Sequence, residues 1–99
     1  MSKSVEIHVL DKKVRLLQPS EGGFRTSLDS VMLAAACPAQ SGDQVLDAGC
    51  GVGGASFCLT WRCPDIRLTG VEREEPYIAL ARQNAVLNGV AKRTEFICA

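Results

Sequence analysis

The feature that most constrains this chain is a glycine-rich corner between a short apolar run and a helical segment. The apolar run is Val45-Leu46, and the corner reads Asp47-Ala48-Gly49-Cys50-Gly51-Val52-Gly53-Gly54. Glycines permit positive φ angles and let a ligand approach the backbone, while free N–H groups at the start of the next helix attract electron-rich atoms. The corner therefore predicts a ligand-binding turn between a strand and a helix.

The residues after the corner continue to alternate between strand-like and helix-like patterns. We expect strands over residues 44–47, 66–72 and 94–98, a loop over 48–53, and helices over 54–62 and from about Pro76 to just before Gly89. Strand, helix, strand, helix, strand at this spacing implies parallel strands joined by right-handed crossovers. The fold class is thus α/β, with a Rossmann-like βαβαβ parallel sheet.

The residues before the corner predict a hairpin and a short helix. Val5, Ile7 and Val9 alternate with polar residues, residues 11–13 can turn, and apolar alternation resumes at Val14. Residues 26–29 have the form of a capping box ahead of an apolar run that stops before Pro38. We therefore expect one partial domain, with a hairpin and loop in residues 1–22, the helix in 23–41 and the βαβαβ unit in 42–99.

Composition excludes several classes of protein. The chain has 99 residues, 46% of them hydrophobic, and no apolar stretch approaches the roughly 20 residues that cross a bilayer. Eleven basic and eleven acidic residues cancel, so bulk charge favours neither a membrane surface nor nucleic acid. The five cysteines contain no Cys-x-x-Cys pair, and His8 is the only histidine. We expect a cytoplasmic protein with reduced thiols, no metal site and no membrane partner.

Asp47 decides between two ligands of the glycine corner. Gly49, Gly51 and Gly54 satisfy the dinucleotide pattern Gly-x-Gly-x-x-Gly, and Glu72 could bind ribose hydroxyls. A dinucleotide brings a pyrophosphate to the corner, however, and the carboxylate of Asp47 would repel it. S-adenosylmethionine has no phosphate and carries an ammonium group and a sulfonium centre, so it tolerates that acid. Two alternatives remain: Asp47 could bond to loop amides, and Glu72 could cap the turn toward Pro76.

The pattern Asp-x-Gly-x-Gly-x-Gly, followed by a strand that ends in an acid, resembles the cofactor half of a class I S-adenosylmethionine-dependent methyltransferase. Residues 23–34 and 81–89 resemble two segments of the small-domain methyltransferases. Within that type, the chain is similar to the bacterial tRNA adenine-N6 methyltransferases that act on valine tRNA. The resemblance covers most of residues 23–98 and represents the N-terminal half of that family.

The resemblance also implies roles for particular residues. Asp47 and the backbone of the loop would hold the methionine end of the cofactor, Glu72 would accept hydrogen bonds from both ribose hydroxyls, and Arg73 would lie beside the adenine. Asp29 and Arg25 match an upstream element that closes over the methionine end, although helix capping explains Asp29 equally well. The loop residues are Ala48, Gly49, Cys50, Gly51 and Gly53.

No catalytic residue is assigned to these 99 residues. Amino-methylating families hold the acceptor nitrogen with an Asn-Pro-Pro-Tyr-like motif, and no Asn-Pro pair occurs here. Cys50 has no histidine to activate it, and Phe57 and Trp61 are expected in the core. We expect an N-terminal fragment that binds the cofactor without catalysis, and an unpaired sheet edge through which copies could associate.

For the full-length enzyme, the resemblance implies methylation of an adenine N6 in tRNA. Three alternatives stay open from sequence. They are methylation of protein glutamine, methylation of another RNA amino group, and a non-catalytic nucleotide- or cofactor-binding module.

Overall fold

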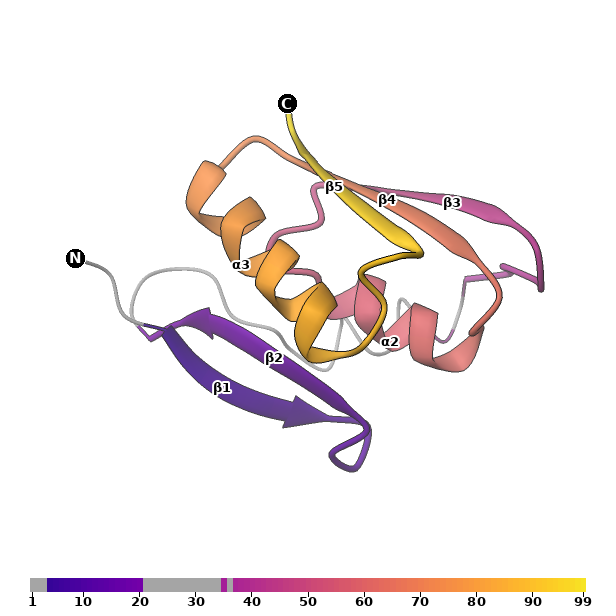
Figure 1. Cartoon of the computed structure of the whole chain (residues 1–99), viewed down its shortest axis with the longest axis horizontal. Coiled ribbons are helices and arrows are strands. Elements are labelled where there is room, and N and C mark those ends of the chain that lie inside the picture. Colours follow the sequence, from indigo (N-terminus) through magenta and orange to yellow (C-terminus); the bar gives the residue numbers. More distant parts are fainter. Residues whose placement is uncertain (1–3, 21–34, 36) are drawn as a thin grey trace.

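The computed structural model describes residues 4–20, 35 and 37–99, which form two helices between two small sheets (Figure 1). The larger sheet consists of β3 (Gln44–Ala48), β4 (Arg67–Glu72) and β5 (Thr94–Cys98), all parallel and in the order β3-β4-β5. Helix α2 (Gly54–Arg62) connects β3 to β4, and α3 (Glu75–Leu87) connects β4 to β5. The predicted α/β class with a Rossmann-like parallel sheet is confirmed.

Local sequence signals set most of these boundaries. Helix α2 and strand β5 have the predicted limits, and Pro76 lies in the first turn of α3, where a missing N–H costs nothing. Gly89 follows the end of α3 with a φ of 72°, the left-handed conformation that closes many helices. Strand β4 begins one residue later than predicted: Ile66 is fully buried, but the pairing with β3 starts at Arg67.

One face of the parallel sheet is covered by both helices (Figure 1). Asp47, Gly70 and Phe96 are paired across the three strands and share this covered face. The ring of Phe57 on α2 lies 5.4 Å from that of Phe96, measured between centroids. On the other face Leu46 is 66% exposed. The crossovers therefore place α2 and α3 on the same side of the sheet.

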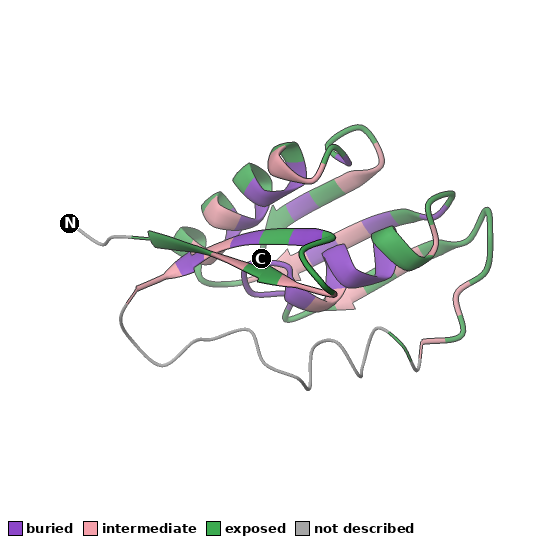
Figure 2. Cartoon of the chain, turned by 90° about the horizontal axis from the view of Figure 1, so that it is seen from below, coloured by how far each residue is buried: buried purple, intermediate pink, exposed green. Residues whose placement is uncertain are grey.

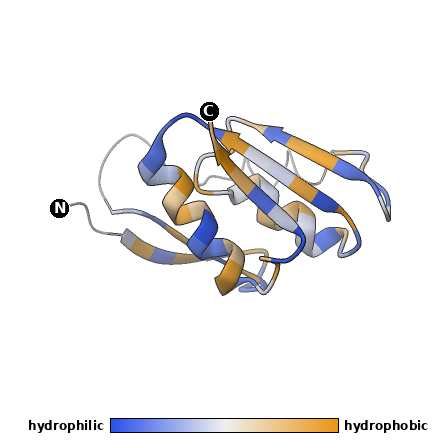
Figure 3. Cartoon of the chain, turned by 45° about the horizontal axis from the view of Figure 1, so that its top comes forward, coloured by the Kyte–Doolittle hydropathy of each residue, from blue (hydrophilic) through white to orange (hydrophobic). Residues whose placement is uncertain are grey.

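The predicted N-terminal hairpin is present and packs against the helices. Strands β1 (Ser4–Val9) and β2 (Val14–Pro19) are antiparallel. Hydrophobic and hydrophilic residues are mixed along the hairpin (Figure 3), and buried residues alternate with more exposed ones along β2. The turn begins at Leu10, one residue earlier than expected, and Lys13 N–H donates to the Leu10 carbonyl at 3.1 Å. Strand β2 contacts both α2 and α3. The order of layers is thus hairpin, helices, parallel sheet.

The hydrophobic core fills the space around the helices. Helix α2 is buried along most of its length (Figure 2), and Phe57 is 1% exposed, as predicted. The expectation that Trp61 lies in the core is wrong. Its side chain is 48% exposed near the end of α2, and the Lys13 ammonium lies 5.3 Å from the ring centroid. A cation–π contact with the hairpin turn replaces core packing there.

Two further observations concern the described residues only. The helix predicted within residues 23–41 falls largely outside them, so that expectation is not addressed. Neither α2 nor α3 has the length and apolar character that a membrane-crossing helix needs.

Candidate functional site

The glycine corner is a turn pinned to the neighbouring strand. The N–H groups of Gly49 and Cys50 both donate to the carbonyl of Val71 on β4, at 2.7 and 3.0 Å. Gly49, Gly51 and Gly53 have φ angles of 72°, 58° and 100°, which side chains rarely permit. No side chain caps the N-terminus of α2, whose N-cap is Gly53. The chain therefore reverses through alternate left-handed glycines and presents backbone at the carboxyl end of β3.

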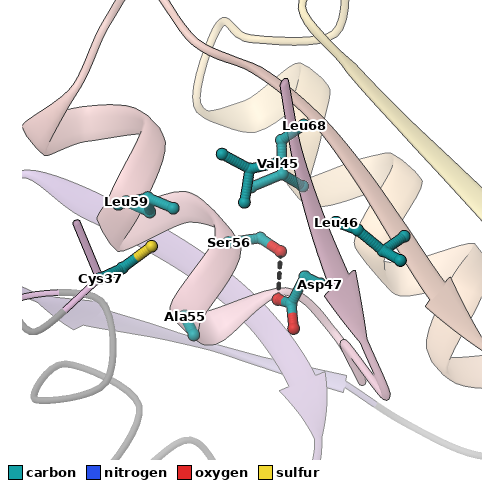
Figure 4. A pocket seen from close by; sticks show the side chains of 8 residues that line it. All are labelled: Cys37, Val45, Leu46, Asp47, Ala55, Ser56, Leu59 and Leu68. Atoms are coloured by element: carbon teal, nitrogen blue, oxygen red, sulfur yellow. Dashed lines mark hydrogen bonds between the residues drawn. The ribbon is translucent and has the colours of Figure 1, made fainter. Parts of the chain in front are cut away.

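Asp47 points from β3 toward the first turn of α2. Its Oδ2 atom accepts a hydrogen bond from Ser56 Oγ at 2.5 Å (Figure 4). The structure thus gives a partner that sequence reasoning missed, because nothing local connects Ser56 to an acid nine residues earlier. One carboxylate oxygen is occupied by this bond, and the side chain is only half-buried.

Glu72 connects the glycine loop to the start of α3. Its Oε1 atom accepts from Gly51 N–H at 3.1 Å, and its Oε2 atom accepts from Glu74 N–H at 2.9 Å. The second bond is the turn-capping role left open from sequence, and the first is a contact with the loop. Each carboxylate oxygen has a further lone pair for a ligand hydroxyl.

The other predicted site residues differ in exposure, and two of them are not described by the structure. Ala48 and Gly49 are exposed, whereas Cys50, Gly51 and Gly53 are buried. Arg73 is exposed directly after Glu72, and its carbonyl accepts from Cys98 Sγ at 3.4 Å. Asp29 and Arg25 lie outside the described residues.

Cys50 reports the electrostatics of the corner. Burial, followed by the negative charges of Asp47 and Glu72, raises the pKa of the thiol from 9.0 to about 12. Both carboxylates thus act on one loop residue, in addition to its burial. A thiol with this pKa is protonated at neutral pH, so Cys50 is no nucleophile.

We predict that alkylation separates these cysteines by environment. At pH 8, iodoacetamide should modify exposed Cys98 first and leave Cys50 and Cys58 unmodified. Burial also raises the pKa of Cys58, to about 11. The reactive thiolate is then about one part in a thousand for Cys58 and one in ten thousand for Cys50. Peptide mapping by mass spectrometry with and without denaturant provides the measurement.

The pH dependence of unfolding follows from the same shift. The folded state keeps the thiols of Cys50 and Cys58 protonated, whereas in the unfolded chain they ionise with a pKa near 9. Their contribution to the free energy of unfolding is therefore fully present below pH 9. It is lost as the pH rises from about 9 toward 12.

In the alkylation experiment, modification of native Cys50 at pH 8 as fast as Cys98 would contradict this description of the loop.

A small apolar cavity shares only Asp47 with the predicted cofactor site. It measures about 160 Å³ and is lined by Cys37, Val45, Leu46, Asp47, Ala55, Ser56, Leu59 and Leu68 (Figure 4). Glu72 and Gly51 do not line it. Ligand pockets commonly measure about 300–1,000 Å³, so this cavity is too small for a nucleoside ligand.

Gly70 is a site-supporting residue that sequence reasoning overlooked. It pairs with Asp47 across β3 and β4. A Cβ atom there would lie 2.5 Å from the ring of Phe96 and 2.9 Å from Cys50 Sγ. A glycine inside a strand often marks such a close approach, and this signal was present in the sequence.

Together these groups form a site of defined chemistry. Two carboxylates lie near the carboxyl ends of adjacent parallel strands, where α/β sheets bind ligands. Each carboxylate is bonded to a group of the loop or of the first turn of α2, Glu72 to Gly51 N–H and Asp47 to Ser56 Oγ. Among the residues the structure describes, no three histidine, cysteine or acidic side chains are placed to hold a metal ion. The arrangement suits an organic ligand with positive charge and hydroxyl groups.

Comparison with known proteins identifies relatives of this fold. A family profile described as a methyltransferase domain matches residues 39–99. The 23S rRNA (uracil(1939)-C(5))-methyltransferase RlmD of Cupriavidus necator is 40% identical over 60 residues, covering 61% of this chain and 13% of RlmD. This chain therefore spans about one eighth of the length of that relative.

Solved structures agree with this result. The Pyrococcus abyssi tRNA (uracil-54, C5)-methyltransferase, in complex with S-adenosyl-L-homocysteine, is 28% identical with a TM-score of 0.74. That comparison covers 97% of this chain and 24% of the enzyme. A Geobacter sulfurreducens S-adenosylmethionine-dependent methyltransferase, in complex with the same molecule, is 30% identical with a TM-score of 0.64, covering 74% and 29%. With a family match over more than half of its residues, this chain belongs to the methyltransferase domain family.

Proposed function

We propose that this chain forms the S-adenosylmethionine-binding part of an enzyme that methylates a base in RNA. The observation that carries the proposal is the contact of Glu72 with Gly51, which joins the acid at the end of β4 to the glycine loop. Asp47 lies on the adjacent strand. Relatives with this fold are bound to S-adenosyl-L-homocysteine, the product form of the cofactor.

The residues of the corner fit this cofactor in charge and in space. Asp47 and Glu72 both place negative charge beside the loop, and after burial both contribute to the raised pKa of Cys50. Negative potential favours the ammonium and sulfonium groups of S-adenosylmethionine and disfavours the pyrophosphate of NAD. At Gly49 no heavy atom lies within 4 Å of the position of a Cβ, so the backbone is open to a ligand.

Each residue then has a binding role. Asp47 and the backbone of residues 48–53 hold the methionine end, Glu72 accepts from the ribose hydroxyls, and Arg73 lies beside the adenine. Asp29 and Arg25 stay predicted as the element over the methionine end. When bound, the cofactor supplies an electrophilic methyl group for in-line displacement, and the residues of this chain orient it and exclude water.

The proposed acceptor is a base in RNA. The names of RlmD and of the P. abyssi enzyme both specify C5 of uracil, in rRNA and in tRNA. These relatives favour uracil C5 as the acceptor atom. Methylation of adenine N6 in tRNA, which the sequence resemblance implied, stays a prediction. Neither of these two relatives is named as a methyltransferase of protein glutamine.

We place the reaction in the cytoplasm, where five free thiols stay reduced.

Calorimetry tests the cofactor assignment. Titration of the chain with S-adenosylhomocysteine should give saturable heat, and titration with NAD at the same concentrations should give none, because of the two carboxylates at the loop. Heat with NAD alone would overturn the assignment and favour a dinucleotide-binding module.

A transfer assay provides the second arm of this test. Residues 1–99, with radiolabelled S-adenosylmethionine and unmodified tRNA or rRNA, should bind the cofactor without turnover, because no acceptor-binding motif has been identified in them. Robust turnover would contradict that expectation. In cells that lack the gene, loss of 5-methyluridine or of N6-methyladenosine from RNA would identify the acceptor.

A further inference from the structure

Two asparagines of α3 hold the hairpin by its backbone. Asn84 Oδ1 accepts from Leu17 N–H at 2.6 Å, and its Nδ2 donates to the Leu17 carbonyl at 2.9 Å. One turn later, Asn88 forms the same pair of bonds with Arg15, at 2.9 and 2.6 Å. Four residues of helix rise about 6 Å and two residues of strand about 6.8 Å, so the two amides match alternate residues of β2. They act as a substitute for a neighbouring strand.

Only Asn84 also reaches the glycine loop. Its Nδ2 group donates a second hydrogen bond, to the carbonyl of Val52 at 3.0 Å. The Nδ2 group of Asn88 instead donates to the Asn84 carbonyl at 2.8 Å. Asn84 is fully buried, and both of its amide protons have acceptors. A side chain in this state keeps a fixed position, since rotation would leave buried polar groups unpaired.

The hydrogen bond to the Val52 carbonyl restricts the conformation of the loop. This carbonyl lies between Gly51 and Gly53, and rotation about glycine φ and ψ angles meets little steric resistance. The same peptide group has its N–H, from Gly53, bonded to the Cys50 carbonyl at 3.0 Å. Asn84 fixes the carbonyl end of that peptide, and Glu72 fixes the N–H of Gly51 on the preceding residue. Two peptide groups of the loop, Cys50–Gly51 and Val52–Gly53, are thus oriented by side chains from outside the loop.

We propose that Asn84 is a positioning residue that sets the orientation of the loop for the methionine end of the cofactor and makes hairpin docking part of the binding site. This inference rests on the proposed function for its ligand, although loop order can be measured without one. Asn88 holds the same strand but does not contact the loop, so it is the matched control.

The test compares Asn84→Ala with Asn88→Ala in the full chain. Both variants should unfold at lower temperature, because each loses two bonds to β2. Asn84→Ala should bind S-adenosylhomocysteine at least about 10-fold more weakly than Asn88→Ala does. Affinity for adenosine, which lacks the methionine end, should change less than about 2-fold in either variant. Equal affinities of the two variants for S-adenosylhomocysteine, or equal loss for both ligands, would overturn the proposal.

A ligand-free measurement separates this inference from the proposed function. Amide hydrogen exchange at Gly53 should accelerate in Asn84→Ala and not in Asn88→Ala, and unchanged exchange in both would overturn the positioning role. If the wild-type chain fails to bind S-adenosylhomocysteine while this exchange difference is present, the proposed function fails and loop positioning stands. Should Asn84→Ala not fold, Asn84→Ser takes its place, because its neutral hydroxyl has a single donor and cannot bond to the carbonyls of both Leu17 and Val52.

Discussion

Glu72→Ala is expected to lower the affinity for S-adenosylhomocysteine by at least about 100-fold. The carboxylate is proposed to accept both ribose hydroxyls, and hydrogen bonds to a charged group contribute about 1.5–3 kcal/mol each. The substitution also removes the acceptor of Gly51 N–H, at 3.1 Å, and so frees the loop on the side of β4. Both losses act on the same ligand. Isothermal titration of wild type and variant measures the ratio of dissociation constants.

Two further variants make the result specific. Glu75→Ala removes an exposed carboxylate three residues away, in the first turn of α3, and should change the affinity less than about 2-fold. Glu72→Gln keeps one acceptor oxygen and no charge, so its affinity should lie between those of wild type and Glu72→Ala. The assignment of the ribose site to Glu72 fails if Glu72→Ala and Glu75→Ala bind S-adenosylhomocysteine equally well.

The parts of the fold that sequence predicted are those encoded by neighbouring residues. Glycines before α2 and Pro64 after it limit that helix, and Pro76 and Gly89 limit α3. The hairpin followed from alternation of apolar residues, although its turn begins at Leu10, before the expected Asp11. Such signals act within a few positions, so they can be read without knowledge of the tertiary structure.

The parts that sequence missed depend on residues far apart in the chain. Asn84 bonds to Leu17 across 67 positions, and its spacing from Asn88 is equally typical of an exposed helix face. Trp61 was assigned to the core by its size, but the hairpin turn leaves it 48% exposed under Lys13. Hydrophobic residue type predicts average burial, whereas the position of a second layer decides it at one residue.

The candidate site shows the same division. Asp47 and Glu72 were predicted from the acid that precedes the glycine corner, the acid that ends the next strand, and the family resemblance that this pattern carries. Their hydrogen bonds were not predicted, since Ser56 reaches Asp47 only after α2 has packed on β3. For Glu72 the alternatives from sequence were ribose binding and a turn cap. The structure shows the turn cap at Glu74 and adds a contact with Gly51 of the loop that was not predicted.

Gly53→Ala should be the most destabilising single substitution in the loop. Gly53 has a φ of 100°, and a Cβ atom there would lie 2.2 Å from Cε2 of Phe57. The backbone strain costs roughly 1–2 kcal/mol, and overpacking against a ring that is 1% exposed adds roughly 1–3 kcal/mol. We expect the free energy of unfolding to fall by about 2–5 kcal/mol, with a drop of about 4–8 °C in Tm for each kcal/mol. Thermal and urea unfolding followed by circular dichroism measure it.

Gly89→Ala separates the two contributions. Gly89 also has a positive φ, of 72°, but no heavy atom lies within 4 Å of its Cβ position, so only the backbone term applies. Its loss should be about 1–2 kcal/mol. In the double variant Gly53→Ala with Phe57→Leu, the smaller side chain relieves the overlap. The double variant should therefore lose less free energy of unfolding than the sum of the two single losses. Equal losses for Gly53→Ala and Gly89→Ala, or strict additivity in the double variant, would show that Phe57 does not restrict the loop. The left-handed glycine would then be required by its φ angle alone, and a larger residue that tolerates that angle, such as asparagine, would serve at the start of α2.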